Sequence, residues 1–390
     1  MGNQPQFHNT GRGSFLGDFA YQRIVERHPR HFLAMLSELF DWEEKTKEFI
    51  QLYKGRGVVG RHPYEPVLIF KMLFLSYLYD VSERAVEELA DLNVLMKWFL
   101  GIAVDEPVPD HSTLTAFKRR FVQNGAWLPL QQVYDDIIRE AVGRGLQFGD
   151  LQVLDSVHTQ ADVNNAKEQR RQGRGGKPRD PDARVVNKGK RRVVQGNGKT
   201  TELQITYRGY KTHVSMNAQT GVVTSLLVTA GNHPDNKAFV GLREHDRTLG
   251  LPTRAYGGDK AYDDTDIYER LEQEGLATAI ALRCQRTTKK DVSKQRWLDL
   301  QADPEYLAAL RQRFRVEQPF GNVKRWHGFE HCRYLGLARY RLQAFFTFMV
   351  HNLKRLVKLL RGVTLRPQAK GRRAENYQPV QAASWAKCVP

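Results

Sequence analysis

Three acidic residues in three different settings are the strongest candidates for chemistry in this sequence. Asp155 in LQVLDSVHTQ and Asp259 in RAYGGDKAYDD each close a short apolar run with the pattern of a β-strand, and Glu317 in RQRFRVEQPFGNVKRW lies in a helix-like segment. At 100° per residue, Arg313 and Lys324 fall within about 40° of Glu317 around that helix. A carboxylate flanked by cations can bind a metal ion while the cations bind a phosphate. Phosphodiester chemistry with two divalent metal ions requires this layout.

The charge of the chain favours a nucleic-acid partner. Lys and Arg total 60 against 43 Asp and Glu, which gives a net charge of +17 and a pI near 9.7. Such a field attracts polyanions. The positive charge is clustered, because residues 167–192 contain eleven Lys and Arg against three acidic residues. We therefore expect DNA phosphates to be bound by cations of this segment, among them Arg170, Arg171 and Arg174.

Composition also bounds the compartment. The three cysteines form no CxxC pair and are odd in number, which favours a reduced, cytoplasmic protein. The longest apolar run, residues 67–78, is interrupted by Lys71 and Ser76 and is shorter than the roughly 20 residues that span a bilayer. We expect this run to be a buried helix and expect no membrane partner.

Residues 1–145 have the pattern of a helical domain. Pro66 opens one helix, Ser82 can cap a second over residues 83–101, and Ser112 can cap a third over 113–122. Short helices with a basic outward face suit a helix-turn-helix-like DNA-binding unit. A helical bundle used for dimerisation explains the same pattern, and both interpretations stay open. The residues expected on the outward face of the third helix are Lys118, Arg119 and Arg120.

Residues 146–361 predict a mixed α/β domain. A strand at LQVLDS, a hairpin over residues 209–229 and alternating helix and strand up to LATAIAL indicate a mixed sheet flanked by helices. A helical region over residues 304–361, broken near 327–334, completes it. The basic insertion at about 159–203 has too little apolar content for a core of its own. Residues 362–390 are expected to form a flexible basic tail.

Several blocks together carry a family resemblance. The pattern R-x3-E-x6-K is present as Arg313, Glu317 and Lys324, although Leu310 stands where a Tyr is frequent. Further blocks are Phe320-Gly321, Arg333-Tyr334-x-Gly336, PDHSTLTAFKRRF, DSVHTQADV, GYKTH, TAGNHPDNKAF and GGDKAYDD. Over residues 60 to 360 the chain resembles the DDE transposases of bacterial insertion sequences, whose catalytic domain has the ribonuclease H-like fold.

The resemblance implies an activity and a set of ligands. Asp155, Asp259 and Glu317 would be the catalytic residues and the ligands of two divalent ions, Mg²⁺ or Mn²⁺. Family members hydrolyse a phosphodiester at the transposon end, and the freed 3′-OH then attacks target DNA. We expect the three carboxyl groups to converge within the separation of a metal pair, roughly 3.5–4 Å. Arg313 and Lys324 would neutralise phosphate beside the scissile bond.

The partners follow from the same resemblance. They are double-stranded DNA, as transposon ends and target, and a second copy of the chain, since pairing two ends implies a homodimer or larger assembly at the nucleoid. Asp235 in GNHPDNK is a weaker candidate ligand, and we favour a helix cap for it. Two alternatives remain: a metal-dependent nuclease of the same fold that cuts without joining, and a catalytically inactive DNA-binding relative.

Overall fold

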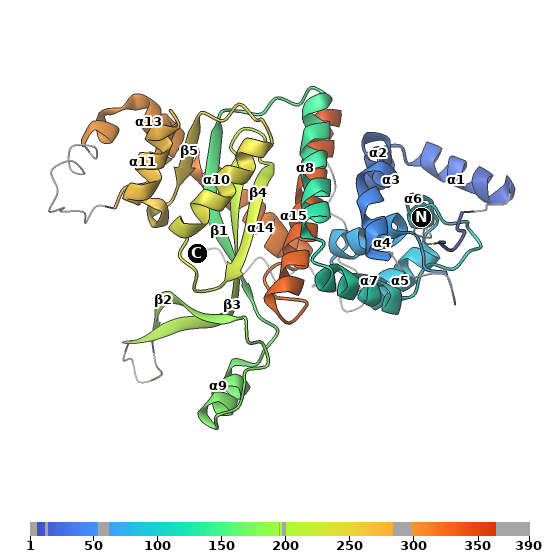
Figure 1. Ribbon diagram of the computed structural model, residues 1–390, viewed down its shortest axis with the longest axis horizontal. Helices are drawn as coiled ribbons and strands as arrows, with labels where there is room; N and C mark the ends of the chain where they lie inside the picture. Colours follow the sequence, from blue (N-terminus) through green and yellow to red (C-terminus); the bar gives the residue numbers. More distant parts are fainter. Residues whose placement is uncertain are drawn as a thin grey trace.

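The computed structural model describes residues 6–11, 15–53, 62–194, 196, 200–283 and 298–363 (Figure 1). The predicted basic tail falls almost wholly outside this part of the chain, because the description ends at residue 363. Within it, no helix is both long and apolar enough to cross a membrane.

The first part of the chain is helical, and its most buried element is α4. Pro66 is the first residue of this helix, as predicted, because its missing N–H is not needed there. Nearly all of α4 is buried, including Phe70 and Phe74, so residues 67–78 form a core helix. The elements are α1 (Phe15–Arg27), α2 (Phe32–Leu39), α3 (Trp42–Thr46), η1 (Lys47–Tyr53), α4 (Pro66–Leu78), α5 (Glu83–Leu92), α6 (Val94–Leu100), α7 (His111–Gln123) and α8 (Trp127–Gly143).

The structure corrects the extent of one predicted helix and the start of another. Ser82 does cap α5, since its side chain accepts from the Ala85 N–H. The single helix expected over residues 83–101 is divided, however, at Asn93, whose Oδ1 accepts from the first N–H groups of α6. The next helix starts at His111, and its cap is Asp110 rather than Ser112. Asn and Asp are strong N-cap residues. Asn93 therefore starts a new helix instead of continuing α5, and Asp110 caps α7 in place of Ser112.

The second part of the chain contains one mixed sheet. In it β1 lies between β3, which is antiparallel to it, and β5, which is parallel, while β4 pairs with β3 and β6 with β5. Three antiparallel strands continued by two parallel ones define the ribonuclease H-like sheet, so the predicted fold class is confirmed. The strands are β1 (Leu151–Gln160), β2 (Arg184–Val194), β3 (Thr200–Asn217), β4 (Val223–Ala230), β5 (Ala255–Gly258) and β6 (Ala277–Ile280).

Helices cover both faces of the sheet. Val153 and Leu154 are consecutive in β1 and belong to different hydrophobic clusters, because side chains alternate along a strand. The cluster of Leu154 contains residues of α10 and α11, and that of Val153 contains residues of α14 and α15. The helices and 3₁₀ turns are α9 (Asn165–Gly173), η2 (Asn236–Ala238), α10 (Phe239–Thr248), η3 (Lys260–Tyr262), α11 (Thr265–Gln273), α13 (Pro304–Leu310), η4 (Arg313–Val316), α14 (Glu317–His327) and α15 (Leu337–Arg361).

The basic insertion has more structure than we predicted. It holds α9 and all of β2, and β2 pairs with the first part of β3. Backbone pairing to an existing long strand satisfies the N–H and C=O groups of β2 without a separate core, which the composition argument overlooked. We call β2 together with residues 200–208 of β3 the arm. Figure 1 shows the arm extending away from the sheet, with α9 beside its base.

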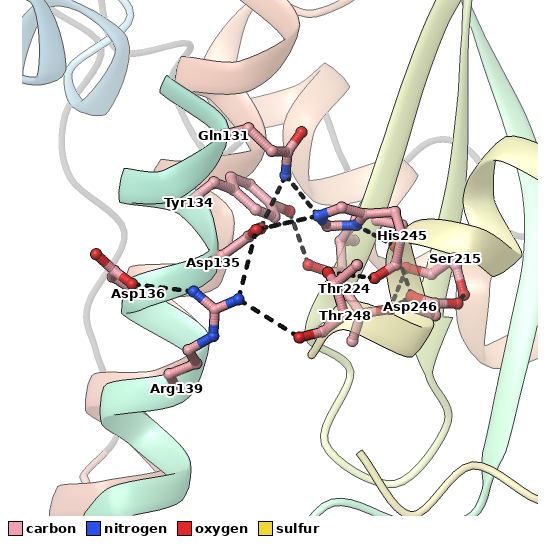
Figure 2. Close-up of polar contacts among 12 residues, drawn as sticks. Gln131, Tyr134, Asp135, Asp136, Arg139, Ser215, Thr224, His245, Asp246 and Thr248 are labelled. Atoms are coloured by element: carbon pink, nitrogen blue, oxygen red, sulfur yellow. Dashed lines mark hydrogen bonds and ion pairs between the residues drawn. The ribbon is translucent and has the colours of Figure 1, made fainter. Parts of the chain in front are cut away.

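The helical part and the sheet share one hydrophobic core. α15 packs against α2, α4 and α8 as well as against β4. A polar network adds to this contact (Figure 2): Nε2 of His245 on α10 lies 3.0 Å from Oδ1 of Asp135 on α8. On its other side, Nδ1 of His245 lies 2.6 Å from the buried Ser225 hydroxyl of β4. The division into domains at residue 145 stays a prediction, since the two parts are packed together.

Candidate active site

Asp155 lies in the middle of β1 and not at its end. The strand continues to Gln160 because its second half pairs with β3 as far as Gly209. Asp155 shares a face of the sheet with Val153 and Val157, since these residues are two positions away on either side. Both valines are buried in the cluster that contains Val316 of η4 and Val323 of α14. The strand therefore presents Asp155 on the face that the Glu317 segment covers.

The surroundings of Asp155 make its charged form costly. Burial is the main cause that raises its pKa, to about 7, and the nearby carboxylates Asp259 and Asp235 raise it further. The Ser156 N–H, which donates to Oδ1 at 2.7 Å, and the cation of Arg313 act in the opposite direction. The positive charge around this half-buried carboxyl group is too small to balance it and its neighbouring carboxylates. Ligands of cations have such surroundings.

Asp259 is held directly next to β1, as predicted. It follows the last residue of β5, which is parallel to β1 with Gly258 opposite Leu154. Its Oδ1 accepts from the Ala261 N–H at 2.9 Å and so caps η3. The glycine before it has a packing reason, because a Cβ at Gly258 would lie 3.0 Å from the ring of Tyr262. The GGD sequence thus allows β5 to approach the buried tyrosine while its next residue turns toward β1.

Glu317 is the first residue of α14 and is exposed. The segment before it, η4, packs against β1. Glu317 and Lys324 are both in the regular helix α14, so the shared face expected for these two residues is retained. Arg313 is in the 3₁₀ turn, where 100° per residue does not apply, so its predicted place on the stripe is wrong. The turn nevertheless brings Arg313 within electrostatic reach of Asp155.

The tight convergence of the three carboxyl groups is not found. Among the described residues, the only trio of His, Cys, Asp or Glu whose ligand atoms all lie within 4.8 Å of one another is Glu87, Asp110 and His111. Carboxylates repel one another without a cation between them. With metal–oxygen bonds near 2 Å and ions roughly 3.5–4 Å apart, ligands of different ions can lie about 8 Å apart. A two-ion site therefore requires a wider spacing than we expected.

Asp235 does not cap the helix that follows it, contrary to our expectation. Its side chain makes no cap hydrogen bond. Its Oδ1 instead accepts from Nζ of Lys211 at 2.9 Å and lies 3.3 Å from Nδ1 of His213. Burial alone would raise the pKa of Asp235, but its contacts with His213 and Lys211 outweigh burial and lower it. Burial lowers the pKa of His213, so its ring is neutral at pH 7. Lys211 is therefore the cation that pairs with Asp235.

Lys211 and His213 are site residues that we did not predict. Both lie in the block GYKTH on β3, where His213 is opposite Ser156 of β1. Their alternation places both side chains on one face of the strand. That pattern, together with the HPD sequence at 233–235, was the available signal. Lys211 also donates to the His233 carbonyl at 2.9 Å, so β3 and the loop before η2 are held together.

Tyr262 contributes a buried hydroxyl to the polar centre. Its ring is fully buried, and its hydroxyl has no hydrogen-bond partner among the described residues. Burial, and then the charges of Asp235, Asp155 and Asp259, raise its pKa well above the ordinary value. The hydroxyl is therefore a neutral group close to three carboxylates. It does not balance their negative charge.

The expected basic face of α7 is only partly present. Arg119 is exposed, as predicted. Lys118 instead pairs with Glu83 and lies over the ring of Tyr334, 4.2 Å from its centroid. Arg120 lies 4.6 Å from the centroid of Tyr53. The outward orientation of Lys118 and Arg120 is therefore a wrong expectation, because helix periodicity does not reveal which neighbours cover a face.

The block Arg333-Tyr334-x-Gly336 joins the catalytic segment to the helices. Arg333 binds Asp80 at 3.0 Å and lies over the ring of Tyr77. The Tyr334 hydroxyl lies 3.0 Å from both Glu83 Oε1 and the Tyr77 hydroxyl. These residues therefore fix how the segment after α14 meets the turn between α4 and α5.

The comparisons with known proteins identify the family of the chain. Residues 158–353 match the family model described as Transposase DDE domain, and residues 22–120 match the Transposase domain (DUF772). The chain belongs to the DDE transposase family and is a DDE transposase, an enzyme of DNA transposition. The first of these matches includes Asp259 and Glu317 and begins three residues after Asp155.

Two solved structures are similar to this chain. One is a cryo-EM structure of the piggyBac transposase synaptic complex with hairpin DNA, at 11% identity, 87% coverage of this chain, 76% of that chain and a TM-score of 0.38. The other is a crystal structure of the Mos1 mariner paired end complex with Mn, at 11% identity, 82% coverage of this chain, 94% of that chain and a TM-score of 0.19. The fold assignment rests on the strand order described above.

Proposed function

We propose that this transposase cleaves and joins DNA at one site made by Asp155, Asp259 and Glu317. The observation that carries the proposal is the placement of Asp155 on the β1 face covered by the Glu317 segment and beside Asp259, and the raised pKa of Asp155 agrees with it. Such an arrangement concentrates negative charge where a divalent cation would relieve it. The family supports DNA as the substrate.

The donor set fits two divalent ions of the Mg²⁺ or Mn²⁺ type. Asp155, Asp259 and Glu317 would hold the ions through the carboxylate oxygens that such ions prefer. When bound, the ions supply activation of the attacking oxygen and stabilisation of the leaving oxygen. The buried Tyr262 hydroxyl near these carboxylates has no hydrogen-bond partner among the described residues. A ligand bound by the carboxylates would offer it one.

The cations of the chain have a separate task. Arg313, near Asp155, and Lys324, two turns after Glu317, would bind the phosphates on either side of the scissile bond. Lys211 is already paired with Asp235 and is therefore not available to neutralise Asp155. Exposed cations of the insertion, Arg170, Arg171 and Arg174, would bind the DNA backbone further away. Because two ends are joined, the working form is a dimer or larger, acting at the nucleoid in the cytoplasm.

The proposal is tested by removing one charge at a time. Asp155→Asn, Asp259→Asn and Glu317→Gln each keep the shape of the side chain, and each should abolish Mg²⁺-dependent nicking of end DNA while leaving its binding intact. Matched controls are Asp266→Asn and Glu269→Gln, two exposed residues of α11, which should nick normally. A triad variant that nicks at the wild-type rate excludes that residue from catalysis.

The same assay separates the alternatives. A product in which the cleaved 3′ end is covalently joined to a second duplex identifies strand transfer. Cleavage without any joined product would identify a nuclease, and binding without cleavage by the wild-type chain would identify an inactive relative.

A further inference from the structure

The arm is a two-stranded ribbon that stands outside the main sheet. Within the described part of the chain, β2 pairs with β3 alone, and residues 200–208 of β3 pair with β2 alone. Figure 1 shows no other element along the outer end of this ribbon. An isolated two-stranded ribbon is marginally stable by itself. A partner that covers the arm would therefore contribute to its stability.

The two faces of the arm differ in chemistry. Cross-strand partners point to the same face, and a bulge between Asn187 and Lys190 keeps these two residues on one face. The other face carries Val186, Val193 and Tyr207, which are partly or fully buried. We call the first of these the polar face; its exposed polar residues are Asn187, Lys190, Arg192, Glu202, Gln204 and Thr206, and the pair of Val185 and Arg208 continues this face at the base of the arm.

The base of the arm is fixed to the catalytic part. Asp180, which is fully buried just before β2, accepts from the Tyr210 hydroxyl at 2.6 Å and from the Gly336 N–H at 3.3 Å. Asp182 accepts from the Leu337 N–H at 3.0 Å. The chain that enters the arm is thus attached both to β3 and to the start of α15. The orientation of the polar face is therefore set by the same sheet that carries Asp155.

We propose that the polar face reads base edges in the major groove of the DNA end that the catalytic site cleaves, an inference that rests on the proposed function. The major groove of B-DNA admits a two-stranded β-ribbon. Arg and Lys recognise guanine there, and Asn and Gln recognise adenine. Glu202 accepts from Lys190 at 3.1 Å and lies 3.6 Å from Arg192 Nε, so two cations and one carboxylate lie together on this face.

The position of the contacts along the DNA follows from the strand. Val214 is opposite Asp155, and Gln204 is ten residues earlier in β3. At about 3.4 Å per residue, the two positions are at most roughly 34 Å apart, and the bend between the arm and the main sheet in Figure 1 shortens this distance. One turn of B-DNA is about as long as this upper limit. DNA that contacts both the catalytic site and the arm therefore meets the polar face within about one helical turn of the scissile phosphate.

Binding selection from a library of randomised DNA duplexes tests the proposal, followed by cleavage assays on the selected sequence. Gln204→Ala is the decisive variant because it changes no charge, and Gln169→Ala on α9 is the matched control. We expect Gln204→Ala to lower the preference for the selected base about tenfold at one or two positions, within about one turn of the cleaved bond. Preferences elsewhere, and all those of Gln169→Ala, should stay as in the wild type.

Three results would overturn the readout by the arm. One is an unchanged consensus and affinity for both Gln204→Ala and Lys190→Ala. Another is a uniform loss of affinity with the consensus intact, which would assign the arm to phosphates alone. The third is a change of oligomeric state with base preferences unchanged, which would assign it to a second copy of the chain. A wild-type chain that selects no consensus and cleaves no DNA would instead overturn the proposed function.

Discussion

Nζ of Lys211 lies 2.9 Å from Oδ1 of Asp235, and the charge of Asp235 nevertheless acts on Asp155. The negative charge of Asp235 raises the pKa of Asp155, while Lys211 is directed at Asp235 and at the His233 carbonyl. Lys211 is thus used in a structural pair, and the raised pKa of Asp155 shows that its charge is not balanced by the cations around it. This separation of roles underlies the predictions below.

Removal of the Asp235 charge should destabilise the protein. Asp235→Asn leaves the largely buried ammonium of Lys211 without its counter-charge, which should lower the free energy of unfolding by about 2 kcal/mol. Urea denaturation measures this. Asp266→Asn breaks an exposed pair with Lys237 and should change stability by less than about 0.5 kcal/mol. Equal effects of the two variants would show that the Lys211 pair is no stronger than a surface contact.

The metal-free protein should lose stability as Asp155 ionises. Burial raises the pKa of Asp155 from 3.8 to about 7. A pKa that is higher in the folded state gives a contribution fully present below about pH 4 and lost as the pH rises through 7. Between pH 4 and 8 the wild type should therefore lose stability relative to Asp155→Asn, by at most about 4 kcal/mol. At pH 8, Mg²⁺ should stabilise the wild type more than the variant; parallel pH profiles would contradict the shift.

Lys324 should affect chemistry more than affinity. It lies seven residues after Glu317 on the same helix, roughly 10 Å along the axis. That is too far for an ion pair but suitable for a phosphate beside a metal bound by Glu317. Lys324→Ala should reduce single-turnover cleavage on saturating end DNA about a hundredfold, a loss of about 2.7 kcal/mol. Lys324→Arg should restore part of it. Normal cleavage by the alanine variant would make Lys324 a surface cation.

The insertion should bind DNA through phosphates outside the polar face of the arm. Replacing Arg170, Arg171, Arg174 and Lys177 by Ala should weaken binding equally for all sequences. The plot of log affinity against log salt concentration should become flatter by about 0.9 for each phosphate that the variant no longer neutralises. Titrations at several salt concentrations measure the slope. A slope equal to that of the wild type would place these residues on a solvated surface.

The sequence by itself determined the local elements and the kind of chemistry. Alternating apolar residues in LQVLDS and TRAYGGD predict strands, and Pro66 and Ser82 predict helix starts, because these signals depend on neighbours in the chain. The strand order of a ribonuclease H-like sheet followed from the resemblance and is present. The net charge predicted a polyanionic partner, in agreement with the family that the comparisons show.

Only the tertiary structure decided which charges meet. Lys118 is covered by Tyr334, more than 200 positions away, and Asp235 binds Lys211 instead of capping its own helix. The insertion forms a strand because β3 is long enough to pair with it. Each outcome depends on contacts between residues far apart in the chain. Local propensities are worth less than about 1 kcal/mol per residue, whereas a buried charge or strand left without its partner costs more, so the long-range contacts prevail where the two conflict.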